Sequence, residues 1–146
     1  MFSYNVQLAG YSFDKFDEKG KVEYDKFVTV FDSFPWLEQL DEANLLKEGC
    51  SATLSVKASD DNKDFWVSIA GDRQKTIFLV GYVYFKEKKT FFGLGKLKMV
   101  RWVDIYEAED SIQIKYLFGL FFNKKFFELE AELKRLKDFD SMEAYS

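Results

Sequence analysis

The stretch of sequence that decides the fold is residues 50–107, where four segments of strand character follow one another. They read CSATLSVK (50–57), FWVSIA (65–70), TIFLVGYVYF (76–85) and LKMVRWVDIYE (97–107). In the first segment Ala52, Leu54 and Val56 alternate with polar residues, the period of two that places one face of a strand in a core. The connections are short and contain Gly, Asp or Asn. We therefore expect an antiparallel meander rather than βαβ units.

Upstream of the meander, the pattern predicts one strand and two helices. Residues 3–8 alternate as a strand does, and residues 17–20 (DEKG) have the composition of a turn. From about residue 22, apolar side chains recur with the spacing of an amphipathic helix, namely Tyr24, Phe27, Val28, Phe31 and Phe34. Pro35 ends this helix and fits the first turn of a second one. We expect the second helix to stop at Gly49.

Downstream of the meander, the sequence predicts helix. Asp110 or Ser111 can cap a first helix, and Asn123 can cap a second. A single helix over residues 110–137 is the alternative, and residues 138–146 are expected to fray. The prediction is one α+β domain over residues 1–146. Its antiparallel sheet has about five strands, with the helices packed on one face.

The residue types that are missing from the sequence exclude several classes of function. The 146 residues contain no histidine and one cysteine. That composition removes Ser–His and Cys–His nucleophiles and the zinc and iron–sulfur frameworks built on Cys and His. No phosphate-binding or dinucleotide-binding glycine motif occurs. We expect a protein that is not an enzyme and holds no metal or cofactor. Paired carboxylates, among 25 Asp and Glu, are the catalytic route that stays open.

The sequence also predicts where in the cell the protein is located. The first residues lack the basic and apolar regions of a signal peptide, and no run approaches ~20 apolar residues. A lone cysteine also forms no intramolecular disulfide, so we expect Cys50 to be buried in a cytoplasmic protein.

Acidic side chains dominate residues 23–48. Seven acids lie there against two lysines: Glu23, Asp25, Asp32, Glu38, Asp41, Glu42 and Glu48 against Lys26 and Lys47. A solvated helix face explains such a bias. The functional hypothesis is a surface that docks another protein of basic charge, with Trp36 as the aromatic anchor. The candidate contact residues are Trp36, Glu38, Asp41, Glu42 and Glu48.

A basic run lies in residues 85–102. Its six cations stand against one acid, Glu87: Lys86, Lys88, Lys89, Lys96, Lys98 and Arg101. Aromatic side chains interleave with them, a pattern of single-strand nucleic-acid binding. The net charge of −4 opposes that function, and strand aromatics that belong to a core are the structural alternative. A nucleic-acid-binding module using this hairpin is thus the alternative function. A small-ligand pocket lined by Phe and Tyr is the third.

Three runs carry a resemblance to a known group of proteins: DFWVSIAGD (64–72), FLVGYVY (78–84) and RWVDIYE (101–107). Over residues 64–136 the chain is similar to small bacterial toxin-immunity proteins, those of contact-dependent inhibition systems in particular. The similarity lies in an acidic, aromatic-rich α+β chain without catalytic residues. These families share no binding signature, so no residue is carried over. The resemblance implies a cytoplasmic protein that binds and blocks the toxic domain of a cognate, often basic, nuclease.

Overall fold

The computed structural model describes residues 1–89 and 97–144, which form seven strands and four helices. In chain order these are β1 (Phe2–Gln7), β2 (Asp17–Lys21), α1 (Tyr24–Ser33), α2 (Trp36–Leu46), β3 (Thr53–Ala58), β4 (Lys63–Gly71), β5 (Thr76–Lys89), β6 (Leu97–Ala108), α3 (Ser111–Phe122), α4 (Phe126–Leu133) and β7 (Lys137–Glu143). The predicted α+β class is confirmed. None of the helices in the described ranges is long and apolar enough to cross a membrane.

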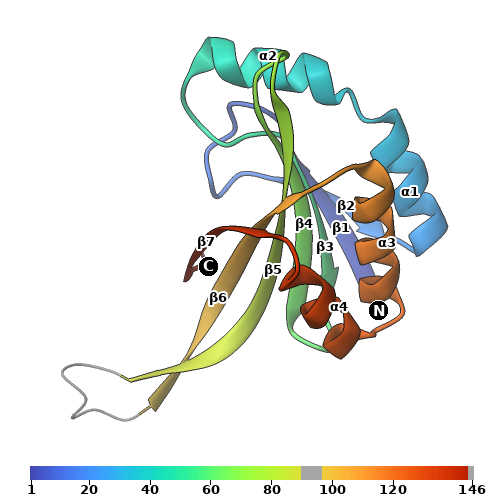
Figure 1. Cartoon of the computed structure of the whole chain (residues 1–146), viewed down its shortest axis with the longest axis vertical. Coiled ribbons are helices and arrows are strands. Elements are labelled where there is room, and N and C mark those ends of the chain that lie inside the picture. The colour runs from blue at the N-terminus through green and yellow to red at the C-terminus, as the bar shows by residue number, and fades with distance from the viewer. Residues whose placement is uncertain (90–96, 145–146) are drawn as a thin grey trace.

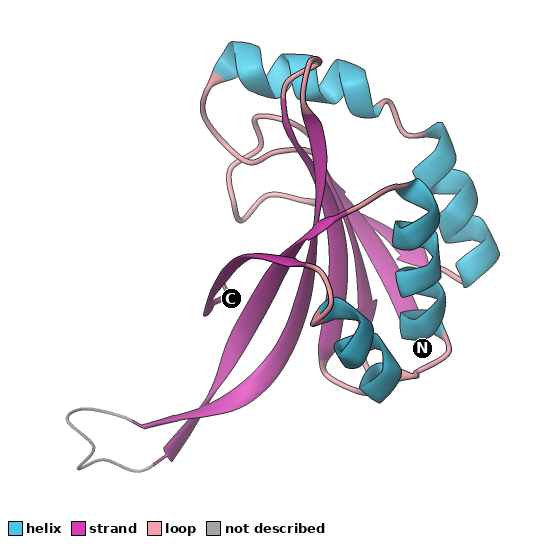
Figure 2. Ribbon diagram, in the orientation of Figure 1, coloured by secondary structure: helices cyan, strands magenta, loops and turns pink. Residues whose placement is uncertain are grey.

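All seven strands belong to one antiparallel sheet in the order β2-β1-β3-β4-β5-β6-β7 (Figure 1). The central strands β3 to β6 follow one another as the predicted meander. Figure 2 shows the helices gathered on one side of the sheet, with α2 across one end of the strands. This arrangement confirms the expected one-sided layer of helices.

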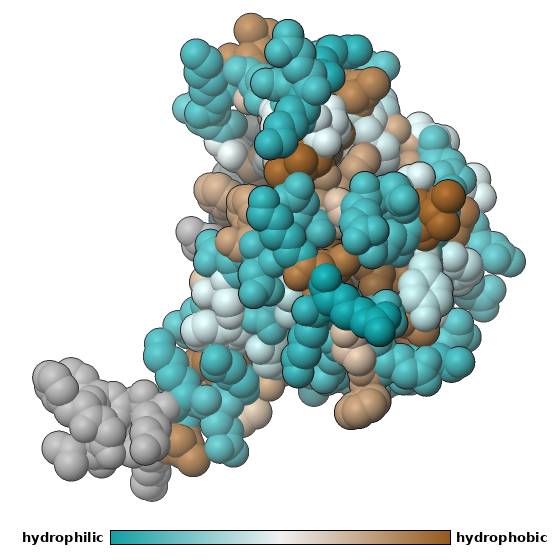
Figure 3. Space-filling model, viewed as in Figure 1, coloured by the Kyte–Doolittle hydropathy of each residue, from teal (hydrophilic) through white to brown (hydrophobic). Residues whose placement is uncertain are grey.

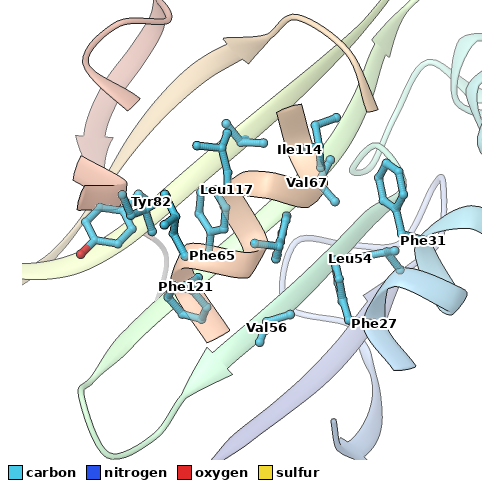
Figure 4. Packing of buried hydrophobic residues seen from close by; sticks show 14 of the residues in the cluster. Phe27, Phe31, Leu54, Val56, Phe65, Val67, Tyr82, Ile114, Leu117 and Phe121 are labelled. Carbon is cyan, nitrogen blue, oxygen red and sulfur yellow. The ribbon is translucent and has the colours of Figure 1, made fainter. Parts of the chain in front are cut away.

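Aromatic rings fill the space between the helices and the sheet. Phe118 on α3 is fully buried, and its ring centroid lies 4.3 Å from that of Phe27 and 4.5 Å from that of Phe65. Phe121 joins the same cluster, whose members reach in from α1, α3 and the strands (Figure 4). Much of the chain's aromatic content is therefore core, as offset and tilted ring packing favours.

The predicted turn at residues 17–20 was wrong, because these residues lie in β2. Asp17 pairs with Val6, and the register shifts between Tyr4 and Asn5. Gly20, with a φ of 89°, pairs with Tyr4 beside this irregularity in the middle of the ladder. Hydrogen bonds to β1 hold a segment that its composition alone would leave as a turn.

The C-terminal segment also differs from the prediction. Residues 137–143 do not fray but form β7 on the edge of β6. All seven residues of β7 are exposed, so no apolar alternation marks the strand in the sequence. Its side-chain anchor is Ser141, whose Oγ donates to Asp104 and accepts from Trp102 Nε1, both at 2.7 Å. Together with β2, this strand raises the sheet from about five strands to seven.

The helix ends were predicted with mixed success. Asp110 caps α3 as expected, accepting a 2.8 Å hydrogen bond from the backbone N–H of Gln113. Two C-terminal helices exist rather than one, but Asn123 closes α3 instead of opening α4. Helix α2 ends at Leu46, and its C-cap residue, Lys47, adopts the left-handed conformation with a φ of 59°. Gly49 therefore is not its stop.

Candidate functional site

The sheet face opposite α1, α3 and α4, called the open face below, carries a concavity of about 470 Å³. None of the helices in the described ranges packs on this face. Strand alternation directs apolar side chains there: Trp66, Leu79, Val83, Val103 and Ile105, with Met142 from β7. Small polar side chains of β1, β3 and β4 complete the lining, among them Asn5, Thr53 and Ser68.

Trp66 lies across the middle of the open face because its partner in the sheet is a glycine. Trp66 on β4 pairs with Gly81 on β5. A Cβ added to Gly81 would lie 2.0, 2.2 and 2.5 Å from the indole atoms Cε2, Cζ2 and Nε1. Such similar distances to three bonded ring atoms mean that the face of the indole, not its edge, covers Gly81. The opposite face of the ring points away from the strands.

The loop between β1 and β2 borders the concavity and is held in place by hydrogen bonds. The Gln7 side chain donates to the carbonyl oxygens of Phe13 and Lys15, each at 3.2 Å. The N–H of Cys50 donates to the carbonyl of Tyr11 at 2.8 Å. The predicted burial of Cys50 is confirmed, and this burial raises the pKa of its thiol. Asp14, in the same loop, faces the concavity.

Charged groups in the concavity favour negative potential. Two carboxylates of the lining, Asp14 and Asp64, stand against one guanidinium, Arg101. Asp64 and Arg101 form an ion pair with each other, and burial lowers the pKa of Arg101. Glu143 pairs with Trp102, so its side chain lies on the opposite face of the sheet, where its carboxylate is 3.4 Å from Nζ of Lys88 and both side chains are half exposed. Exposed ion pairs of this length contribute little.

A second polar cluster lies on the helix-covered face, beside a cavity of about 220 Å³ next to α4. Tyr82 donates to Glu130 at 2.7 Å, and Tyr84 donates to Asp104 at 2.9 Å. Burial, followed by the hydrogen bond to the carboxylate, raises the pKa of each phenol. Both phenols therefore keep their protons at neutral pH. Tyr82 links β5 to Glu130 on α4, and Tyr84 links β5 to Asp104 on β6.

We predict that alkaline pH destabilises the protein through Tyr82. Its pKa is raised in the folded state, so its contribution is complete below the unfolded value of about 10 and is lost as the pH rises above it. The free energy of unfolding should fall by at most about 1 kcal/mol per pH unit for this group. Urea unfolding between pH 9 and 11 measures the slope. Tyr82→Phe should flatten it, whereas Tyr116→Phe, at an exposed tyrosine, should not.

The acidic set predicted from residues 23–48 is divided between two helices: Glu38, Asp41 and Glu42 lie on α2, and Asp25 and Asp32 lie on α1. The aromatic member of the set turns inward. Trp36 Nε1 donates to the carbonyl of Phe31 at 3.0 Å, and the indole contacts the ring of Phe78. Asp41 binds Arg73 through both carboxylate oxygens, at 2.8 and 2.9 Å, which lowers the pKa of Asp41. Glu38, Glu42 and Glu48 are exposed. Their contact with a partner stays a prediction.

The basic set of residues 85–102 is divided between the two faces of the β5–β6 hairpin. The register places Lys86, Lys88 and Lys98 on the side opposite Arg101. Nζ of Lys86 lies 3.9 Å from the centre of the Trp102 ring, and Arg101 pairs with Asp64. Lys96 and the glycines before it lie outside the described residues, as does the side chain of Lys89. The described cations therefore do not form one surface.

Sequence reasoning missed the concavity, although one signal was available. Residues 77–83 are apolar almost throughout, which indicates a strand with apolar side chains on both faces. Because the helices cover only one face of the sheet, the apolar side chains on the other face are left without a covering helix. No group of His, Cys, Asp or Glu side chains that could hold a metal ion occurs within the described ranges.

Comparison with known proteins supplies no relative: no family model, no curated protein and no solved structure matches this chain.

Proposed function

We propose that this protein is a non-catalytic module that binds another protein through the open face of its sheet. The observation that carries the proposal is a continuous apolar strip on that face. It begins at Trp66 and Leu79, passes Val83 and continues past the end of β4.

Beyond β4, the strip runs along a projecting ribbon, called the arm below, which comprises residues 85–89 and 97–101. Here β5 pairs with β6 alone, and the ribbon extends past the rest of the sheet (Figure 1). Phe85, Met99 and Leu97 share the open-face side and are 46%, 55% and 57% exposed. Contiguous exposed apolar side chains of this kind mark interaction sites.

The composition of the strip suits a protein partner. Trp, Phe, Met and Arg are enriched in interfaces, and Trp66, Phe85, Met99 and Arg101 all occur here. On the side of the molecule shown in Figure 3, by contrast, hydrophilic side chains dominate the outer surfaces of the helices.

Charge points to a basic partner. The chain has a formal net charge of −4, and the exposed acids of α2 lie at one end of the sheet. Acidic surfaces accelerate encounter with basic ones. Together with the resemblance to toxin-immunity proteins, this charge supports a basic toxin domain as the partner. Nucleic acid has less support, because Arg101 and Lys88 are paired with carboxylates.

Titration calorimetry with the purified product of the gene adjacent to its own tests the proposal. We expect a complex that Phe85→Glu, on the arm, weakens at least tenfold. Leu45→Glu is the matched control, since Leu45 is 77% exposed on α2. If Leu45→Glu abolishes binding and Phe85→Glu leaves it unchanged, the acidic α2 surface is the contact instead. Absence of any complex would remove the toxin-immunity role.

A further inference from the structure

We infer that the partner docks by adding a strand to the arm: one extended segment of it pairs antiparallel with the edge of β5 at Phe85 and Glu87. This inference rests on the proposed function, because it names the part of the bound protein that the arm would hold and the bonds that would hold it.

The first support is the direction of the backbone groups in the arm. The N–H of Ala144 donates to the carbonyl oxygen of Arg101 at 2.9 Å, on the β7 side of β6, so the backbone groups of Arg101 point away from β5. In an antiparallel ladder, two paired residues exchange either both hydrogen bonds or neither. Arg101 pairs with Phe85. The N–H and carbonyl of Phe85 therefore point out of the ribbon, and those of Glu87, two residues further along, point the same way.

The hairpin between β4 and β5 leads to the same directions independently. The N–H of Asp72 donates to the carbonyl oxygen of Lys75 at 3.1 Å, and hydrogen-bonded pairs then recur at every second position of this ladder. Asp64 and Val83 form the last such pair, because β4 pairs with β5 no further. The next backbone groups that β5 directs to this side lie beyond the end of β4, where none of the strands in the described ranges pairs with them.

The second support is that the arm has too few strands. A two-stranded ribbon is at best marginally stable in water, and a third strand or a covering layer makes it stable. In the arm β5 pairs with β6 alone, and the ribbon projects past the rest of the sheet (Figure 1). An edge of unpaired N–H and carbonyl groups is the template on which another chain adds a strand.

The third support is the pattern of side chains along this edge. A residue that pairs with Phe85 would project onto the open face beside a ring that is 46% exposed, so an apolar side chain suits that position. Glu87 lies on the same face, is exposed and forms no ion pair with a described residue. A lysine or arginine suits the position opposite Glu87, which agrees with a basic partner. On the other face, Lys86 and Lys88 already contact an aromatic ring and a carboxylate.

Amide hydrogen exchange, followed by NMR in the complex with the product of the adjacent gene, tests the pairing. We expect the amide protons of Phe85 and Glu87 to exchange at least tenfold more slowly in the complex than in the free protein, because hydrogen-bonded amides are protected. Met99 is the internal control. It pairs with Glu87 and directs its N–H out of the opposite edge of the ribbon, so its exchange should change less than twofold.

Two variants at one position separate the backbone from the side chain. Glu87→Pro removes an N–H from the edge without removing a bond of the β5–β6 ladder, a place where proline is tolerated. We expect it to weaken the complex at least tenfold. Glu87→Gln keeps the N–H and removes the charge, so it should weaken the complex by only about threefold. Circular dichroism checks that both variants are folded.

Unchanged exchange at Phe85 and Glu87 in a complex that still forms, or equal affinity of Glu87→Pro and wild type, would overturn the inference. Binding through the open face would then stand, because Phe85→Glu tests it through a side chain. Protection of the same two amides in the free protein as its concentration rises, with a dimer in sedimentation, would make a second copy the occupant and also overturn the inference. Absence of any complex removes the proposed function and this inference together.

Discussion

Replacing Phe118 with alanine should lower the free energy of unfolding by about 3–5 kcal/mol, which is a large share of the stability of a domain of this size. Phe118 is fully buried between Phe27 on α1 and Phe65 on β4, with ring centroids 4.3 and 4.5 Å away. Rings held by two different elements cannot both move into the space left behind, so a cavity persists. Chemical denaturation followed by circular dichroism measures the loss.

Phe127→Ala is the matched control for this experiment. Phe127 lies on α4 and is 85% exposed, so its truncation should change the free energy of unfolding by less than about 0.5 kcal/mol. Similar losses for the two variants would contradict the packing of α3 against the sheet.

Gly81→Ala should cost about 1–3 kcal/mol and displace Trp66 from the open face. The new Cβ would lie 2.0 Å from Cε2 of the indole, and such overpacking forces a side chain or a strand to shift. Glycine is otherwise a poor strand residue, so an alanine would stabilise β5 if space allowed. Denaturation gives the cost, and a shift in tryptophan emission reports the displaced ring.

Two further variants separate the clash from a general effect of alanine. Adding Trp66→Ala to Gly81→Ala should remove the penalty of the Cβ, which gives a favourable coupling energy in a double-mutant cycle. Gly119→Ala, within α3, places its Cβ 3.6 Å from the Tyr24 ring, an ordinary contact. This variant should be neutral or stabilising, because alanine favours helix by about 1 kcal/mol over glycine. A harmless Gly81→Ala would contradict the face-on position of the indole.

Periodicity in the sequence predicted the elements whose two faces differ in solvent exposure. Helix α1 shows its stripe because Phe27 and Phe31 face the core, and β3 alternates because Leu54 and Val56 do. Strand β7 has no buried residue and β2 has no more than one partly buried residue, so burial leaves no such pattern in them. Their strand conformation comes from backbone pairing with β1 and β6, which local sequence does not encode.

The site was harder to predict than the fold, because it depends on register. That Trp66 meets Gly81 follows from the pairing of β4 with β5, which a one-residue slip would undo. The period of two in residues 97–107 does predict how two of the cations are placed. Arg101 and Lys98 differ by an odd number of positions, so alternation already places them on opposite faces of β6. The prediction treated the cations of residues 85–102 as one surface because they are close in sequence, and so it did not separate the two faces.

The strongly charged outer strands have a consequence for how copies of the protein meet. Strands β2 and β7 form the two edges of the sheet, where unpaired backbone groups invite another chain to add a strand. Strand β7 carries three carboxylates against one ammonium group: Asp138, Asp140 and Glu143 against Lys137. Two such edges brought together would repel each other. An aromatic-rich chain is in this way guarded against joining its sheets edge to edge into aggregates, while it presents an apolar surface on one face.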